Sequence, residues 1–148
     1  MSITKKVLVF AATYNESENI ETLIESIKNL KHNPDLLIID DGSPDKTSSK
    51  IENLQKIYNN IFLINRHKKL GLDTAHKEAY EFAKKNNYDF LITMDADLSH
   101  DPNEIENFIF YLDENPFVIG SRYTEGGKCL MKFSRLILSK YGNLLIKF

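Results

Sequence analysis

Residues 90–102, FLITMDADLSHDP, join an apolar run to a polar loop that carries two carboxylates one residue apart. The apolar part lacks polar alternation, as do strands that are buried on both faces of a parallel sheet. In a strand, residues i and i+2 point to one face, so Asp95 and Asp97 are expected to converge on one point. Two carboxylates this close repel each other unless a proton or a cation lies between them. A helix cap or a solvated loop would use the same residues, so this stretch alone does not distinguish them from a cation site.

Four more apolar runs of this kind occur along the chain, and helical segments separate them. The runs lie at residues 7–12, 36–40, 61–65 and 117–121. Apolar residues recur with helical period at residues 19–30, 45–58, 74–86 and 103–115. This alternation of strand and helix predicts a right-handed, doubly wound, mostly parallel sheet of the Rossmann-like α/β class. Because no linker or repeat interrupts the pattern, residues 1–148 are expected to form a single domain.

The composition agrees with one globular domain and excludes several classes of protein. Of the 148 residues, 42% are hydrophobic and 27% are charged, which is too apolar for a disordered chain. The net charge of −2 argues against binding to nucleic acid. The lone cysteine, Cys129, fits a reducing compartment, and neither a signal peptide nor a membrane span is recognisable. We therefore expect a cytoplasmic protein that is soluble or peripheral on a membrane.

The charge is unevenly distributed, and the C-terminal segment is basic. Residues 128–148 contain five Lys or Arg residues and no acid, whereas the preceding residues contain 14 bases and 21 acids. Apolar residues of this segment recur near one helical stripe, so it is expected to form a basic amphipathic helix. Such a helix binds an anionic membrane surface, although a core helix that covers the strand at 117–121 would show the same pattern.

Ligands of open α/β sheets bind at the carboxyl ends of the strands, and here those ends are acidic. Acids that face an arginine suit a divalent cation together with a phosphorylated ligand. Receiver domains and haloacid-dehalogenase phosphatases fit less well, because their paired acids follow the first strand. Neither a P-loop nor a Gly-x-Gly-x-x-Gly motif after the first strand is present. The strand-end residues are Glu16, Asp40, Asp41, Asp95, Asp97 and Arg122.

Five strings, in order over residues 10–143, resemble the family 2 glycosyltransferases, which have a nucleotide-sugar-binding GT-A fold. The strings are TYNE, DDGSPDKT, KKLGLDTA, DADLSHDP, and GSRYTEGG followed by SRLILSKYGN. Within the family, the resemblance is to the dolichyl-phosphate mannose synthases. It implies inverting transfer of mannose from GDP-mannose to a dolichyl or other polyprenyl phosphate, with Mg²⁺ or Mn²⁺ as the cofactor. A phosphate acceptor is already anionic near neutral pH, so this reaction needs no general base.

The same resemblance implies roles for individual residues, position by position. The base and ribose of the donor would be held by Ala12, Tyr14, Glu16, Ile39 and Asp41. The diphosphate would lie along Asp95, Ala96, Asp97 and Arg122. The metal ligands would be Asp95, Asp97 and Ser99. The catalytic residues would be Asp97, Arg122 and Arg135, the last of which would bind the acceptor phosphate. Asp40 and His100 are interpreted as structural residues.

Three departures from the family pattern leave other interpretations open. Ala12 stands where the family usually has Pro, and Asp73 replaces the second Gly of the family's GLGTA. The chain also stops at Phe148, whereas the catalytic domains of the family continue, so a truncated protein is expected. The alternatives are a polyprenyl-phosphate glycosyltransferase that uses a UDP-sugar, a truncated nucleotide-sugar-binding domain without activity, and a metal-binding regulatory domain.

Overall fold

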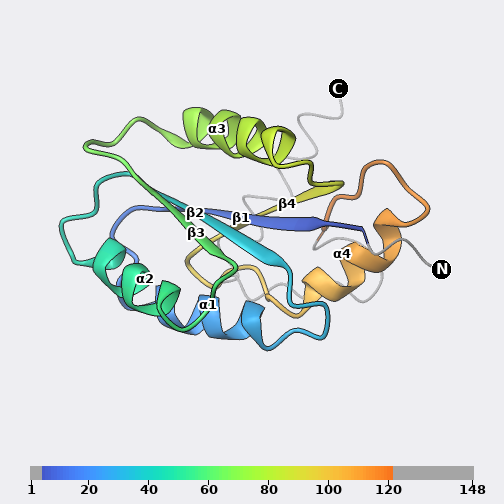
Figure 1. Ribbon diagram of the computed structural model, residues 1–148, viewed down its shortest axis with the longest axis horizontal. Helices are drawn as coiled ribbons and strands as arrows, with labels where there is room; N and C mark the ends of the chain where they lie inside the picture. Colours follow the sequence, from blue (N-terminus) through green and yellow to red (C-terminus); the bar gives the residue numbers. More distant parts are fainter. Residues whose placement is uncertain (1–4, 122–148) are drawn as a thin grey trace, which may run out of the picture. The chain divides into compact units, whose positions relative to one another are not determined.

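The computed structural model of the protein describes residues 5–121, in which four strands alternate with four helices (Figure 1). The elements are β1 (Val7–Thr13), α1 (Ile20–Lys28), β2 (Asp35–Asp40), α2 (Thr47–Gln55), β3 (Ile61–Asn65), α3 (Leu72–Lys85), β4 (Phe90–Asp95) and α4 (Glu104–Leu112). Each strand coincides with one of the apolar runs to within one residue. Each helix lies within a segment of helical period, except that α3 begins two residues before its segment. The predicted alternation is therefore confirmed for this part of the chain.

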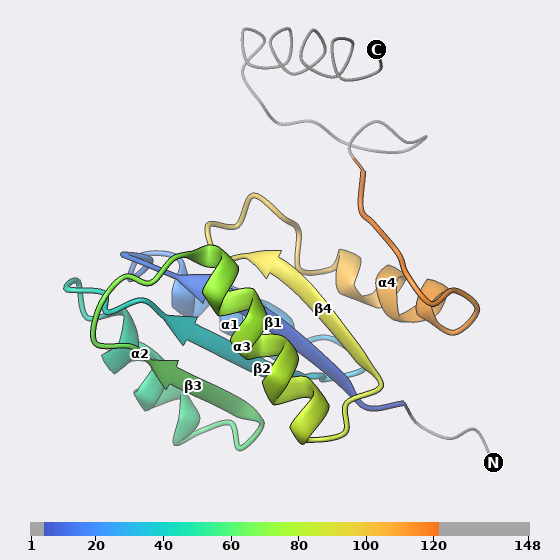
Figure 2. The ribbon, with the colours of Figure 1, turned by 90° about the horizontal axis from the view of Figure 1, so that it is seen from above.

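The four strands form one parallel sheet in the order β3-β2-β1-β4. The chain moves outward from β1 to β2 and β3, and then returns to place β4 on the other side of β1. The direction of winding thus reverses between β1 and β4. In open α/β sheets, such a reversal opens the crevice in which ligands bind, at the carboxyl ends of the strands. Those ends all lie on the same side of the sheet in Figure 2.

Helices cover both faces of the sheet (Figures 1 and 2), so two hydrophobic layers bury its strands. α1, α2 and α4 lie on one face, and α3 lies on the other. The stripe that the sequence places on α1 is fully buried, and comprises Ile20, Leu23, Ile24 and Ile27. Side chains of this size stabilise the folded state by about 1.5–3 kcal/mol each when fully buried, which anchors α1 firmly.

α3 approaches the sheet closely because its buried face is made of small residues. Ala75, Ala79 and Ala83 recur every four residues and pack in one core cluster with Phe10 of β1. The rings of Phe10 and His76 also form a T-shaped pair, with their centroids 5.2 Å apart. The position of α3 therefore fixes the loop that precedes it, which reaches the carboxyl edge of the sheet.

Residues 117–121 do not form the predicted fifth strand. An apolar run becomes a strand only when a neighbouring strand accepts its backbone hydrogen bonds, and no strand pair within residues 5–121 includes this run. Residues 1–116 form one compact unit that carries the described sheet, and residues 117–148 form a second unit. Arg122, Arg135 and the helix predicted at 128–148 lie outside the described residues. Within residues 5–121, no helix has the length and apolar content needed to cross a bilayer.

Candidate functional site

Three of the predicted site residues lie in one row across the carboxyl edge of the sheet. Ala12 of β1 is in register with Ile39 of β2 on one side and with Asp95 of β4 on the other. Residues in register on parallel strands point to the same face, so these three side chains lie together on the side of α3. The row spans the reversal of winding between β1 and β4, where the fold favours ligand binding.

Asp95 closes β4, and its carboxylate lies in solvent. The side chain is 60% exposed, and Oδ2 is 3.7 Å from Nε2 of His100. The backbone N–H of Asp95 donates to Nδ1 of the same histidine at 3.1 Å. His100 thus contacts both the backbone and the side chain of Asp95. These contacts agree with the interpretation of His100 as a structural residue of the loop.

Asp97 lies in the loop beyond β4, so the loop rather than strand alternation sets its direction. Its Oδ1 accepts the backbone N–H of Ser99 at 2.9 Å, and Leu98 between them has a φ of 60°. Hydrogen bonds from the Ser99 hydroxyl and N–H lower the pKa of Asp97, so its carboxylate stays charged. Ala96, by contrast, is buried and anchors the start of the loop.

The residues of this loop suit a hard divalent cation that also binds a ligand. Asp95, Asp97 and Ser99 offer oxygen atoms only, as Mg²⁺ and Mn²⁺ prefer. Within residues 5–121, no group of three or more His, Cys, Asp or Glu side chains is arranged to hold a metal ion. Mg²⁺ is commonly held by one or two carboxylates, with phosphate oxygens and waters at its other positions. The pair of carboxylates therefore fits a metal that a diphosphate helps to bind.

The neighbouring acids Asp40 and Asp41 have separate environments because they point to opposite faces of the sheet. Asp40 is fully buried and accepts hydrogen bonds from Thr13 Oγ1 at 2.8 Å and from Ser48 Oγ at 2.8 Å. It also accepts both the N–H and the hydroxyl of Ser43, at 2.9 and 2.5 Å. These bonds tie β1, β2 and α2 together, as expected of a structural acid.

Asp41 is held by the loop that leads into α3. Its Oδ1 accepts Nη1 of Arg66 at 2.8 Å, and its Oδ2 accepts the N–H groups of Leu70 and Gly71 at 3.2 and 3.0 Å. A carboxylate offers about four acceptor positions, so roughly one remains for a ligand. The predicted binding residue Asp41 is thus a preoriented acceptor that also organises a loop.

Arg66 is a residue of the site that the sequence analysis missed. Its side chain is only 6% exposed, and it binds Glu78 through Nε and Nη2, at 3.1 and 2.7 Å, in addition to Asp41. Nη1 also donates to Thr74 Oγ1 at 2.9 Å. Arg66 follows Asn65 directly at the end of β3, and this strand end was not among the four from which site residues were predicted. A charged residue just after a buried strand was the available signal.

Tyr14 and Glu16 follow β1 at the same edge. The backbone around them is fixed, because Asn15 N donates to Ser43 Oγ at 2.9 Å and Glu16 N donates to Thr47 Oγ1 at 3.1 Å. Tyr14 is 40% exposed. The Glu16 carboxylate accepts Asn19 Nδ2 at 2.8 Å. Both side chains are accessible enough to meet a ligand.

Residues 8–144 match the glycosyl transferase family 2 domain. The chain belongs to this family. The strings that carried the resemblance in the sequence all fall within the matched range, so the recognition of glycosyl transferase family 2 is confirmed.

Curated relatives within glycosyl transferase family 2 include enzymes named for mannosyl transfer. The chain is 32% identical over 148 residues to polyprenol monophosphomannose synthase of Mycolicibacterium smegmatis, covering 98% of this chain and 56% of that one. It is 37% identical over 139 residues to dolichol-phosphate mannosyltransferase of Pyrococcus furiosus, covering 91% of this chain and 38% of that one. The chain therefore spans about half, or less, of the length of these relatives.

Solved structures confirm the GT-A-type fold of this family 2 chain. A mannosyltransferase of Pyrobaculum calidifontis, in complex with GDP-Man and Mn²⁺, superposes with a TM-score of 0.63 at 20% identity, over 76% of this chain and 33% of that one. Staphylococcus aureus TarS 1–349 superposes with a TM-score of 0.57 at 21% identity, over 74% of this chain and 32% of that one. At these identities, the likeness concerns the fold.

Proposed function

We propose that this protein binds GDP-mannose together with Mg²⁺ or Mn²⁺ and transfers mannose to a polyprenyl phosphate, with inversion at C1 of the sugar. The observation that carries the proposal is the row of Ala12, Ile39 and Asp95 at the reversal of winding. This row brings residues assigned to the nucleoside next to one assigned to the diphosphate. The relatives named as polyprenol- and dolichol-phosphate mannosyltransferases support the choice of sugar and acceptor.

The nucleoside would lie over the ends of β1 and β2. Tyr14 would stack on the base, because its ring is exposed at this edge. Glu16 and Asp41 would accept hydrogen bonds from amino or hydroxyl groups of the base and ribose. Ala12 and Ile39 would provide the apolar floor between them.

The diphosphate would lie along the loop that follows β4. Asp95 and Asp97, with Ser99, would hold the metal ion, and Ala96 would place the loop backbone beside the phosphates. The bound cation would stabilise the negative charge of the departing diphosphate. The lowered pKa of Asp97 keeps this carboxylate charged and ready to bind the cation.

The acceptor phosphate would need cationic side chains rather than a base. A phosphate monoester is already anionic near neutral pH, so no proton has to be removed before attack. Arg122 and Arg135, which lie outside the described residues, would bind the donor and acceptor phosphates through charge-assisted hydrogen bonds. Because a polyprenyl phosphate resides in a bilayer, we propose a peripheral location on the cytoplasmic face of a membrane.

Calorimetric titration of the protein with GDP-mannose and with UDP-glucose, in the presence of Mn²⁺, tests the donor site. We expect binding of GDP-mannose that requires Mn²⁺ and that Asp97→Asn weakens strongly, because a charge-neutralising metal contributes several kcal/mol. Asp101→Asn is the matched control, since Asp101 lies on the same loop and accepts the N–H of Asn103 at 3.0 Å.

Equal binding by the parent and Asp97→Asn would overturn the metal assignment. Preference for UDP-glucose would replace the proposed donor by a UDP-sugar. If neither nucleotide sugar bound, the proposal of a donor site would fall. A transfer assay with radiolabelled GDP-mannose and a short polyprenyl phosphate then shows whether the chain turns over.

A further inference from the structure

The orientation of the Tyr14 ring depends on a single described contact. The backbone on its C-terminal side is fixed by the hydrogen bonds of Asn15 and Glu16, but these bonds leave the side-chain torsions free. Among the ring interactions of residues 5–121, the one that involves Tyr14 is with Lys69, whose Nζ lies 4.0 Å from the ring centroid. A cation at this distance is attracted by the negative face of the ring. Lys69 is therefore the described cation that faces this ring.

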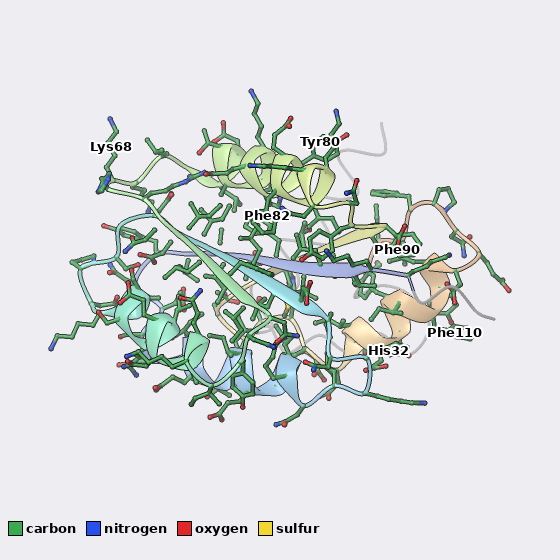
Figure 3. All side chains as sticks on the ribbon, in the orientation of Figure 1. His32, Lys68, Tyr80, Phe82, Phe90 and Phe110 are labelled. Carbon is green, nitrogen blue, oxygen red and sulfur yellow. The ribbon has the colours of Figure 1, made fainter. Side chains whose placement is uncertain are left out.

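Lys69 is itself carried by a loop of fixed conformation. Residues 66–71, which we term the lysine loop, connect β3 to α3. Figure 3 shows Lys68 at the tip of this loop. The N–H groups of Leu70 and Gly71 donate to the buried carboxylate of Asp41. The residue next to Lys69 is thus bonded directly to an acid of the donor site.

The first half of the lysine loop packs on Gly42. This glycine has a φ of +73°, and a Cβ placed on it would lie 3.0 Å from the carbonyl oxygen of Arg66 and 3.2 Å from the backbone nitrogen of Lys68. Such contacts leave no room for a side chain at residue 42, so the loop backbone packs directly against Gly42. The loop is therefore held at its beginning and at its end by the end of β2.

The charge of Lys69 is available for the ring. None of the ion pairs among residues 5–121 includes Lys69. The ammonium covers one face of Tyr14, and the residue is still 40% exposed, which leaves surface for a second stacking partner. A flat ligand that stacks on Tyr14 would therefore take the face of the ring that the lysine does not occupy.

We propose that Lys69 is a positioning residue of the donor site: it holds one face of the Tyr14 ring so that the other face receives the base of the nucleotide. This inference rests on the proposed function, in which Tyr14 stacks on that base. Lys69 acts through the tyrosine and makes no contact with the nucleotide. Its effect should therefore disappear when the ring is removed.

A double-mutant cycle on GDP binding, measured by calorimetry with Mn²⁺ present, tests this inference. Lys69→Met keeps most of the side-chain length and removes the charge, and we expect it to weaken GDP binding about two- to fivefold, the range of an exposed cation–ring contact. Lys68→Met removes the same charge one residue away and is expected to leave binding unchanged. In a Tyr14→Leu background, Lys69→Met should have no further effect. Lys69→Arg, made in the otherwise unchanged protein, keeps the positive charge and should bind GDP as tightly as the parent.

Parent-like affinity of Lys69→Met would overturn the inference, as would a loss that persists in the Tyr14→Leu background. If the parent binds UDP rather than GDP, the proposed donor is wrong, and the same cycle is carried out with UDP. If it binds neither, the contact is measured in the ligand-free protein by NMR. The ring should shift the ε-proton resonances of Lys69 upfield, and Tyr14→Leu should abolish this shift; unchanged resonances would contradict the inference.

Discussion

Arg66 is the residue on which the geometry of the carboxyl edge depends most. Its guanidinium connects Asp41 of the site to Glu78 of α3, and both it and Asp41 are almost completely excluded from solvent. A buried ion pair gains less than its Coulomb energy suggests, because both charges lose hydration. Removing one partner, however, leaves the other charge buried and uncompensated. Removing one partner therefore destabilises the folded state by more than the intact pair stabilises it.

We predict that Arg66→Met lowers the free energy of unfolding by about 3–5 kcal/mol, since it leaves Asp41 as an unpaired buried carboxylate. Urea denaturation followed by circular dichroism measures this change. Glu78→Gln is the matched control, because the Glu78 side chain is 42% exposed and its ion pair with Arg66 is expected to contribute 1 kcal/mol or less. A loss below about 1 kcal/mol for Arg66→Met would show that water or another group satisfies Asp41.

At the scale of elements, hydrogen bonds to the Asp45 carboxylate connect the start of α2 to the residues that precede α1. Asp45 accepts the N–H of Thr47 at 3.1 Å, the hydroxyl of Thr47 at 2.6 Å and the N–H of Ser17 at 3.0 Å. Partial burial of Asp45 opposes its ionisation, but the hydrogen bonds from Thr47 and Ser17 outweigh it and lower the pKa of Asp45 to about 2. The folded state therefore binds a proton here less readily than the unfolded chain does.

This pKa predicts a pH-dependent contribution to stability from Asp45. The unfolded value is about 3.9, so the contribution is fully present above about pH 4 and is lost as the pH falls toward 2. Asp45→Asn should destabilise the protein at pH 7, and the difference from the parent should shrink as the pH falls from 4 to 2. Denaturant titrations at several pH values measure it, with Ser49→Ala on the exposed side of α2 as the control. A difference that is constant over this range would contradict the assignment.

Elements with a strong apolar pattern could be predicted from the sequence, and those that depend on distant partners could not. β1 and β2 are buried on both faces, so their composition alone identifies them. The run at residues 117–121 has the same composition, yet it has no partner strand among the described residues. The end of β3 offered Arg66 as a candidate, but its pairing with Asp41, 25 positions away, could not be predicted from local pattern. Local pattern identifies candidates, whereas pairing depends on the whole fold.

At the scale of the whole molecule, charge is segregated along the chain. Residues 128–148 hold five bases and no acid, whereas the rest of the chain is acidic. We predict that the protein binds vesicles of anionic lipid, because each Lys or Arg near such a surface contributes about 1 kcal/mol. Co-sedimentation with anionic and with neutral vesicles, at low and high salt, measures this binding. It should be strong only with anionic lipid at low salt.

The control for this prediction uses lysines of the described sheet unit. Replacing Lys128, Lys132 and Lys140 by Gln should abolish co-sedimentation. The same replacement of three exposed lysines elsewhere, Lys31, Lys56 and Lys84, should leave it nearly unchanged. Equal co-sedimentation with both lipids, or none with either, would instead favour a core position for the C-terminal segment.

The register between β1 and β4 limits how the length of β4 can vary. The ladder runs from Val7 opposite Phe90 to Ala12 opposite Asp95. Successive residues of a strand point to opposite faces, so an insertion or deletion of one residue within β4 would turn Asp95 away from Ala12 and Ile39. A substitution along β4 changes one side chain, but a change of one residue in its length relocates the acid. The number of residues in this strand is therefore as important for the proposed site as the acid at its end.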